Sequence, residues 1–200
     1  SHWWGEEFPK FLASLEKHAE FMASATKSSS DHTYWICTIV NEQNIVNLGD
    51  QDDPDYLQQC PFEVALTSSI CIGVAQVQDQ ETKMLTRIWC LYELLRTIEL
   101  QLQMDICTCS GVLSRQQQMT PESQEVVTAL LSLTPEKLEQ AEASNMRDKE
   151  IIEKRILGSI GWTRMCQKLQ RTVGLVFRLG DANIVVRDPL TRRPLNLIEE

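Results

Sequence analysis

The stretch TRIWCLYELL, residues 86–95, decides the fold class, because it combines an aromatic, a thiol and a carboxylate with the apolar spacing of a helix. The apolar run ICIGVA, residues 70–75, precedes it and is typical of a strand. In α/β proteins, a strand, a loop and a helix with an acid in its first turns present polar groups at the carboxyl end of a sheet. The stretch therefore predicts a helix that starts at Ile88 and holds Glu93 at a candidate site.

Strand and helix patterns alternate on both sides of this stretch. The run YWICTIV, residues 34–40, is rich in β-branched and aromatic residues without clean alternation, as expected of a strand buried on both faces of a parallel sheet. The alternation favours an α/β fold in which helices flank a parallel sheet. The predicted elements are a helix over 6–22, a strand over 34–40, a short helix over 61–66, a strand over 69–77, a helix over 88–102 and a short strand over 105–112.

The second half of the chain predicts helices followed by a hairpin. Thr-Pro-Glu occurs at 120–122 and at 134–136, where Thr suits a helix N-cap and Pro the first turn. A charged helix is predicted over 144–160, and the runs at 173–177 and 184–186 flank a Gly-Asp-Ala-Asn turn as in a β-hairpin. The predicted organisation is an α/β core over 1–112, a helical continuation over 113–170, and a hairpin with a tail over 171–200.

Composition disfavours several classes of protein. Apolar residues form 42% of the 200-residue chain, enough for a packed core, while the net charge of −9 disfavours nucleic acid as a partner. The seven cysteines form no C-x-x-C pair and the three histidines lack zinc-ligand spacing, so we expect no metal and a reducing, cytoplasmic location. Cys107 and Cys109 fit either two strand-end residues or a weak metal or redox motif. No run is apolar and long enough to predict a membrane segment.

Two motifs resemble the Toll/interleukin receptor (TIR) homology domain in a divergent form. WCLYEL, residues 89–94, matches the Trp-Cys-Leu-x-Glu-Leu motif that opens a helix after a strand in plant-type TIR domains. SHWWGEEF, residues 1–8, is similar in register to the turn that follows their first strand, which would lie upstream of residue 1. The chain also resembles a set of algal and protist proteins in which an SHWWGE opening and an RIWCxxE motif recur together. The resemblance covers roughly residues 1–105 and implies a flavodoxin-like parallel sheet flanked by helices.

The resemblance implies an activity as well as a fold. Some TIR domains are NAD glycohydrolases, and the acid of their Trp-Cys-x-x-Glu motif corresponds to Glu93, with NAD as substrate and no resident cofactor. Cleavage of the nicotinamide–ribose bond passes through an oxocarbenium-like state, which a nearby carboxylate stabilises. Further residues expected to bind NAD are Trp89 and Cys90, which lie within one helical turn of Glu93, Arg87 in place of the family's usual serine, and Trp3 and Trp4.

A non-catalytic interpretation stands beside the enzymatic one. Glu93 near a helix start is stabilised by the helix dipole without any other role, and Trp89 and Cys90 are common core residues. Trp3 and Trp4 suit either a cleft or the cap of the core. The polar segment 41–59 suits an interaction module of a larger protist protein, one that binds other TIR-like domains or a second copy of itself. If Glu93 is catalytic, it should line an open cleft with Trp3, Trp4 or this segment.

Overall fold

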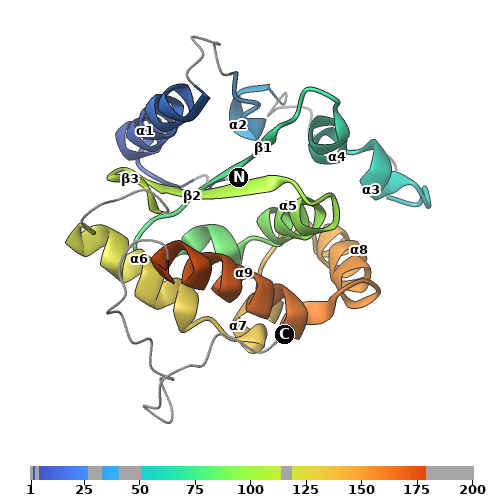
Figure 1. The fold of residues 1–200 in the computed structure, drawn as a ribbon. Helices are drawn as coiled ribbons and strands as arrows, with labels where there is room; N and C mark the ends of the chain where they lie inside the picture. Colours follow the sequence, from blue (N-terminus) through green and yellow to red (C-terminus); the bar gives the residue numbers. More distant parts are fainter. Residues whose placement is uncertain (1, 3–4, 27–32, 41–50, 114–118, 179–200) are drawn as a thin grey trace.

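The computed structural model describes residues 2, 5–26, 33–40, 51–113 and 119–178. Within them the chain forms a mixed α/β fold in three layers (Figure 1). A small sheet occupies the middle layer, helix α1 (Phe8–Thr26) covers one face, and α5 (Ile88–Glu99) and α6 (Pro121–Leu131) cover the other. None of the helices in this described part is long and apolar enough to cross a membrane.

The sheet has three strands among the described residues, in the order β1-β2-β3. Strand β1 (Gly73–Val77) pairs in parallel with β2 (Gln103–Thr108), and α5 forms the crossover between them. This β-α-β unit confirms the strand, loop and helix predicted around residues 70–95. A Cβ added at Gly73 would lie 2.9 Å from the carbonyl oxygen of Gln103, so glycine permits the close start of this pairing.

The candidate strand over 105–112 is two strands. β2 ends at Thr108, and β3 (Gly111–Val112) turns back to pair with it antiparallel. The sheet is therefore mixed, and the larger all-parallel flavodoxin-like sheet that the TIR resemblance implies is not confirmed in the described part of the chain.

Local sequence signals correctly place most helices. Thr120 and Thr134 accept hydrogen bonds from backbone N–H groups at the starts of α6 and of α7 (Pro135–Glu139), as N-cap residues do. Asn145 does the same for α8 (Met146–Leu157). The shorter elements before α5 are α3 (Tyr56–Gln59), α4 (Pro61–Thr67) and a 3-10 turn η1 (Lys83–Thr86).

The strand predicted over 34–40 is wrong. Residues 33–36 have no regular structure, and Cys37–Val40 form the one-turn helix α2. Cys37 is buried, whereas Trp35 and Ile39 are 43% and 66% exposed. The segment therefore lies at the surface with one side covered, and a strand buried on both faces is not what its environment supports.

The first half of the predicted hairpin is also wrong. Residues 173–177 belong to the end of helix α9 (Gly161–Arg178), while 184–186 lie outside the described residues. Buried Met165, Leu169 and Val173 recur every four residues and place one face of α9 against the core. This period begins at Trp162, ahead of the apolar run that suggested a strand.

Two apolar clusters lie on the two sides of the sheet. The larger one surrounds α5, whose Leu91, Leu94 and Leu95 are fully buried, and extends from Cys37 to Val173. The smaller one lies between α1 and the sheet and is formed by Phe11, Val77, Cys107 and Val112. Because α5 is fixed on most of its circumference, a side chain near its middle is held at a well-defined place.

Candidate functional site

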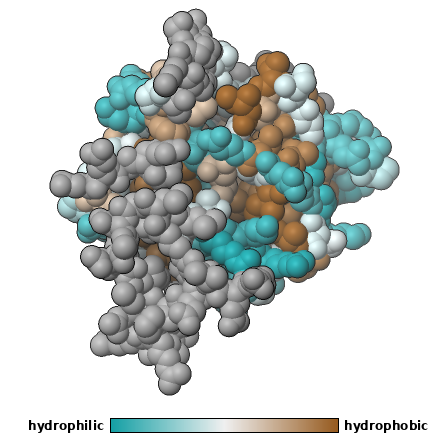
Figure 2. Space-filling view, in the orientation of Figure 1, coloured by the Kyte–Doolittle hydropathy of each residue, from teal (hydrophilic) through white to brown (hydrophobic). Residues whose placement is uncertain are grey.

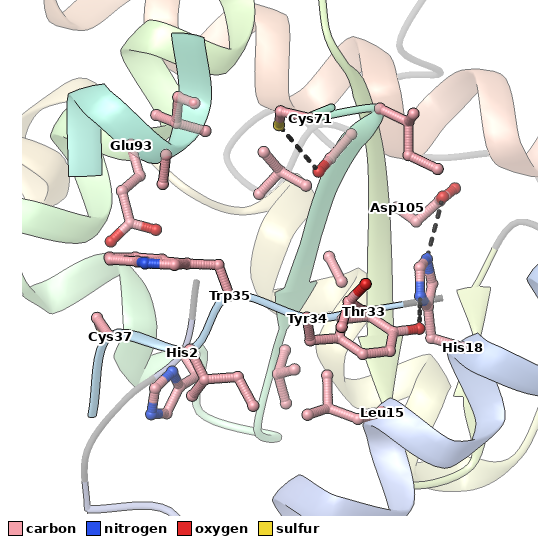
Figure 3. A pocket seen from close by; sticks show the side chains of 18 of the residues that line it. His2, Leu15, His18, Thr33, Tyr34, Trp35, Cys37, Cys71, Glu93 and Asp105 are labelled. Carbon is pink, nitrogen blue, oxygen red and sulfur yellow. Dashed lines mark hydrogen bonds and ion pairs between the residues drawn. The ribbon is translucent and has the colours of Figure 1, made fainter. Parts of the chain in front are cut away.

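A cleft of about 690 Å³ opens between α1, the segment 33–37, α4 and strand β1. Its walls are mostly apolar, and a few polar side chains converge on it, which is the usual character of a small-molecule site. Its volume lies within the range of about 300–1,000 Å³ typical of such sites. The polar or titratable side chains that matter below are His2, His18, Tyr34, Cys37, Glu93 and Asp105 (Figure 3).

Glu93 lines this cleft, although only 7% of the residue is exposed. Its side chain points toward the indole of Trp35, which lines the cleft from the segment before α2 (Figure 3). Its backbone carbonyl accepts a hydrogen bond from the Thr97 hydroxyl, one turn later on α5, at 2.7 Å. The carboxylate is thus carried by a packed helix at the wall of a mostly apolar cleft.

Most of the neighbours expected for Glu93 lie outside the described residues, namely Trp3, Trp4 and residues 41–50. Residues 51–59 of the expected segment are described and are not part of the cleft lining. Among the described residues, Trp35, Cys37 and His2 line the cleft with Glu93. Burial lowers the pKa of His2 to about 4, so at neutral pH this imidazole is uncharged.

Trp89 lies one layer behind the cleft wall. Its indole stacks on Phe62, a lining residue, with ring centroids 5.1 Å apart. Its Nε1–H donates to a carboxylate oxygen of Asp148 at 3.2 Å, on the side away from the cleft. Trp89 and Glu93 share a helix, but Trp89 supports the wall whereas Glu93 reaches the cavity.

Cys90 and Arg87 also lie outside the lining. The Cys90 thiol is 3.5 Å from the carbonyl oxygen of His2 and ties that residue to α5. Arg87 precedes α5, and its backbone forms an isolated parallel β-bridge with that of Glu142. There the Ile88 N–H donates to the Glu142 carbonyl at 2.9 Å. Of the six site residues predicted from sequence, the structure brings Glu93 into the cleft lining. Trp89, Cys90 and Arg87 lie outside the lining, and Trp3 and Trp4 lie outside the described residues.

A buried ion pair fixes the wall that carries Phe62 to the helix that carries Glu93. Glu63 of α4 accepts two hydrogen bonds from the Arg96 guanidinium of α5, at 2.6 and 2.8 Å. The Tyr92 hydroxyl donates to the same carboxylate at 2.9 Å. These charge-assisted bonds raise the pKa of Arg96 above its ordinary value. The relative position of α4 and α5, and hence the width of the cleft, depends on them.

A second set of polar residues in the cleft was not found from the sequence. His18 of α1 is 7% exposed and contacts Tyr34 and Asp105, which come from the segment before α2 and from β2. Its Nδ1 is 2.6 Å from the Tyr34 hydroxyl and its Nε2 is 3.3 Å from an Asp105 oxygen. The available signal was a histidine on the apolar face of a predicted helix, but neither partner follows from local sequence.

The charge of the cleft is one-sided. Among the described residues, no Lys or Arg lines it, whereas the carboxylates of Glu93 and Asp105 do. A ligand part that enters this space is therefore neutral or cationic, because a phosphate beside two carboxylates would be repelled. Among the same residues no group of three or more His, Cys, Asp or Glu side chains is arranged to hold a metal ion.

No family model, curated protein or solved structure matches this chain. The functional interpretation accordingly rests on the motif at residues 89–94 and on the geometry of the cleft.

Proposed function

We propose that the protein is a TIR-like NAD glycohydrolase, in which Glu93 is the essential carboxylate. The observation that supports this most is the position of Glu93 at the wall of a cleft of about 690 Å³, beside the indole of Trp35. The motif alone is also compatible with a purely structural Glu93. A Glu93 side chain packed among the core residues, away from the cleft, would have favoured that interpretation.

The chemistry that this arrangement favours is cleavage of the bond between nicotinamide and ribose. As the bond breaks, positive charge develops on the ribose, and a carboxylate in a space of low dielectric stabilises that charge strongly. Nicotinamide leaves as a neutral molecule, so this substrate needs no acid to assist departure. The Trp35 ring offers an aromatic face on which a flat heterocycle stacks.

The absence of cations from the described lining limits how NAD binds. Its nicotinamide–ribose half carries a positive charge and suits the two carboxylates, whereas its pyrophosphate does not. We therefore place only the nicotinamide–ribose half inside the cleft, with the phosphates outside the lining formed by the described residues.

The proposal is tested by measuring nicotinamide release from NAD by the purified protein and by Glu93→Gln. Loss of the carboxylate should lower the rate by about 100-fold or more, the usual effect of removing a group that stabilises transition-state charge. Glu125→Gln, which changes an exposed carboxylate on α6, is the matched control and should keep the full rate. Full activity in Glu93→Ala would remove the basis of the proposal.

A second function, a non-catalytic interaction module, is favoured by one observation. Apolar side chains stand exposed around the cleft mouth, and Figure 2 shows such a patch near the connection between α4 and β1. Ile70 and Ile72 in this connection are 86% and 66% exposed, and Val64 on α4 is 59% exposed. Surfaces of this kind often mark contacts with another protein. A second copy of the chain or another TIR-like domain is the partner that the resemblance implies.

Sedimentation velocity over a wide concentration range separates the two functions. A module that self-associates should form dimers or larger species that dissociate in an Ile70→Ser, Ile72→Ser double variant. Leu157→Ser, which changes a 60% exposed apolar residue at the end of α8, is the control. A strict monomer at high concentration, with no binding to TIR-like domains, would exclude this function.

A further inference from the structure

Three polar side chains from three separate elements form a chain at the far side of the cleft from Glu93 (Figure 3). Asp105 lies on β2, His18 on α1, and Tyr34 on the segment before α2. All three line the cleft. We propose that this chain is the proton donor of the cleft, with Tyr34 as the group that touches the ligand, and that it extends the substrates to nucleosides whose base leaves only when protonated. The inference rests on the proposed function, because it uses Glu93 as the carboxylate on the ribose side.

The geometry assigns a different role to each member. Both ring nitrogens of His18 are occupied, Nδ1 by the Tyr34 hydroxyl at 2.6 Å and Nε2 by Asp105 at 3.3 Å. His18 therefore has no nitrogen left for a ligand and acts through Tyr34. Asp105 also accepts a hydrogen bond from the Gln103 amide at 2.8 Å, which fixes the carboxylate that faces the imidazole. Tyr34 is the positioned end of a carboxylate–imidazole–phenol chain.

The protonation state of His18 decides what Tyr34 offers to the cleft. In the neutral imidazole with its proton on Nε2, Nδ1 accepts the Tyr34 O–H, and the phenol has no hydrogen for a ligand. In the imidazolium, Nδ1–H donates to the Tyr34 oxygen, and the phenolic hydrogen is free to point into the cleft. Burial raises the pKa of Tyr34 to about 12, so the phenol stays protonated and remains a donor in the physiological range.

The proton transfer that follows is balanced. As the glycosidic C–N bond breaks, its electron pair stays with the base, the Tyr34 O–H proton moves to a base nitrogen, and the His18 Nδ1 proton moves to the Tyr34 oxygen. Water adds to the anomeric carbon and gives a proton to Glu93. The net reaction is hydrolysis, and exchange with solvent restores the imidazolium and the Glu93 carboxylate. Asp105 stabilises the imidazolium before transfer.

The cleft chemistry defines the substrate class. A purine or other neutral base is a poor leaving group until it is protonated, whereas nicotinamide in its riboside departs without a proton. The described lining has two carboxylates and no Lys or Arg, which disfavours phosphorylated substrates. The expected class is therefore a non-phosphorylated nucleoside with a flat base, which stacks against Trp35.

The inference is tested with two substrates that share ribose, inosine and nicotinamide riboside, together with NAD. In Tyr34→Phe, kcat for inosine should fall by about 100-fold, the usual contribution of a positioned acid, while kcat for nicotinamide riboside changes by less than about twofold. Tyr56→Phe is the matched control, since its buried hydroxyl bonds to Asp148 at 2.8 Å outside the cleft. In this control both rates should be lowered by the same factor or not at all.

The split between the two nucleosides provides a readout for His18 that a purely structural role would not move. In His18→Asn, kcat for inosine should fall as in Tyr34→Phe, while kcat for nicotinamide riboside changes by less than about twofold, because only inosine needs the proton that passes through Tyr34. The titratable groups around His18 are Asp105 and Tyr34, with Cys107 near Tyr34 on β2. Burial raises the pKa of Cys107 to about 12, so its thiol stays uncharged near neutral pH.

The outcomes separate this inference from the proposed function. Turnover of NAD or nicotinamide riboside without turnover of inosine overturns the inference and leaves the proposed function standing. An equal loss for both nucleosides in Tyr34→Phe also overturns it. If none of the three substrates is cleaved, the inference and the proposed function are both refuted. A loss of activity with inosine alone in Tyr34→Phe, together with a loss of all activity in Glu93→Gln, supports both.

Discussion

The buried pair between Glu63 and Arg96 allows the sharpest stability prediction. The side chains are 8% and 17% exposed, and two short hydrogen bonds join the carboxylate to the guanidinium. In Arg96→Met the Glu63 carboxylate keeps the Tyr92 hydroxyl but loses its positive partner. Leaving one charge of a buried pair uncompensated costs about 3–5 kcal/mol in free energy of unfolding. For a chain of this size the melting temperature should fall by about 6–20 °C.

Urea unfolding followed by circular dichroism measures this loss. We expect a lower midpoint with an unchanged slope, because the same surface is exposed on unfolding. The double variant Glu63→Gln, Arg96→Met should recover at least about 1 kcal/mol relative to Arg96→Met alone, since the buried charge is then gone. Arg164→Met, at an exposed position on α9, is the control. A loss below about 1 kcal/mol in Arg96→Met would refute the view that this pair fixes the cleft wall.

Three further predictions concern other parts of the fold. Gly73→Ala should lower the free energy of unfolding by about 1–3 kcal/mol, because the added Cβ would lie 2.9 Å from the Gln103 carbonyl oxygen. Chemical denaturation measures this loss, and an unchanged midpoint would contradict the close pairing of β1 with β2. Gln76→Met should raise the free energy of unfolding by about 1 kcal/mol in the same assay, because neither amide atom of this buried side chain has a hydrogen-bond partner among the described residues. A lower free energy of unfolding in this variant would contradict that reasoning. Burial, with the charge of Asp79, raises the pKa of Glu6 to about 7, so the folded state binds more protons than the unfolded one between about pH 4.5 and 7. Stability from this residue is therefore lost as pH rises through that window, and the melting temperature of Glu6→Gln should exceed that of wild type at pH 8 but not at pH 4.

Elements whose sequence signals lie within a few residues were predicted correctly. The Thr-Pro-Glu starts of α6 and α7 and the strand before α5 follow from caps, proline and apolar spacing, which act within a few residues. The prediction of a strand over 34–40 failed because the β-branched composition of this segment does not reveal that one side of it is exposed. The end of helix α9 was predicted wrongly because the strand-like run at 173–177 masked a helical period that begins at Trp162.

The site shows the same division between local and long-range information. Glu93 followed from a motif on one helix, whose orientation is set by the apolar residues on either side. Trp35 and the chain formed by His18, Tyr34 and Asp105 depend on how three separate segments meet, which no local pattern encodes. The position of Trp89 behind Phe62 likewise depends on where α4 packs, so spacing along α5 alone was insufficient to place it.

The central claim is that the Glu93 carboxylate in the cleft carries out the cleavage step. The most direct measurement is a single-turnover reaction with enzyme in large excess over NAD, comparing wild type with Glu93→Gln and quantifying nicotinamide. Because all the NAD is bound at saturating enzyme, the rate reports bond cleavage and not affinity. We predict that wild type releases one nicotinamide per NAD and that Glu93→Gln, with an unchanged melting temperature, does so at least about 100-fold more slowly. Equal single-turnover rates in the two proteins would contradict the account.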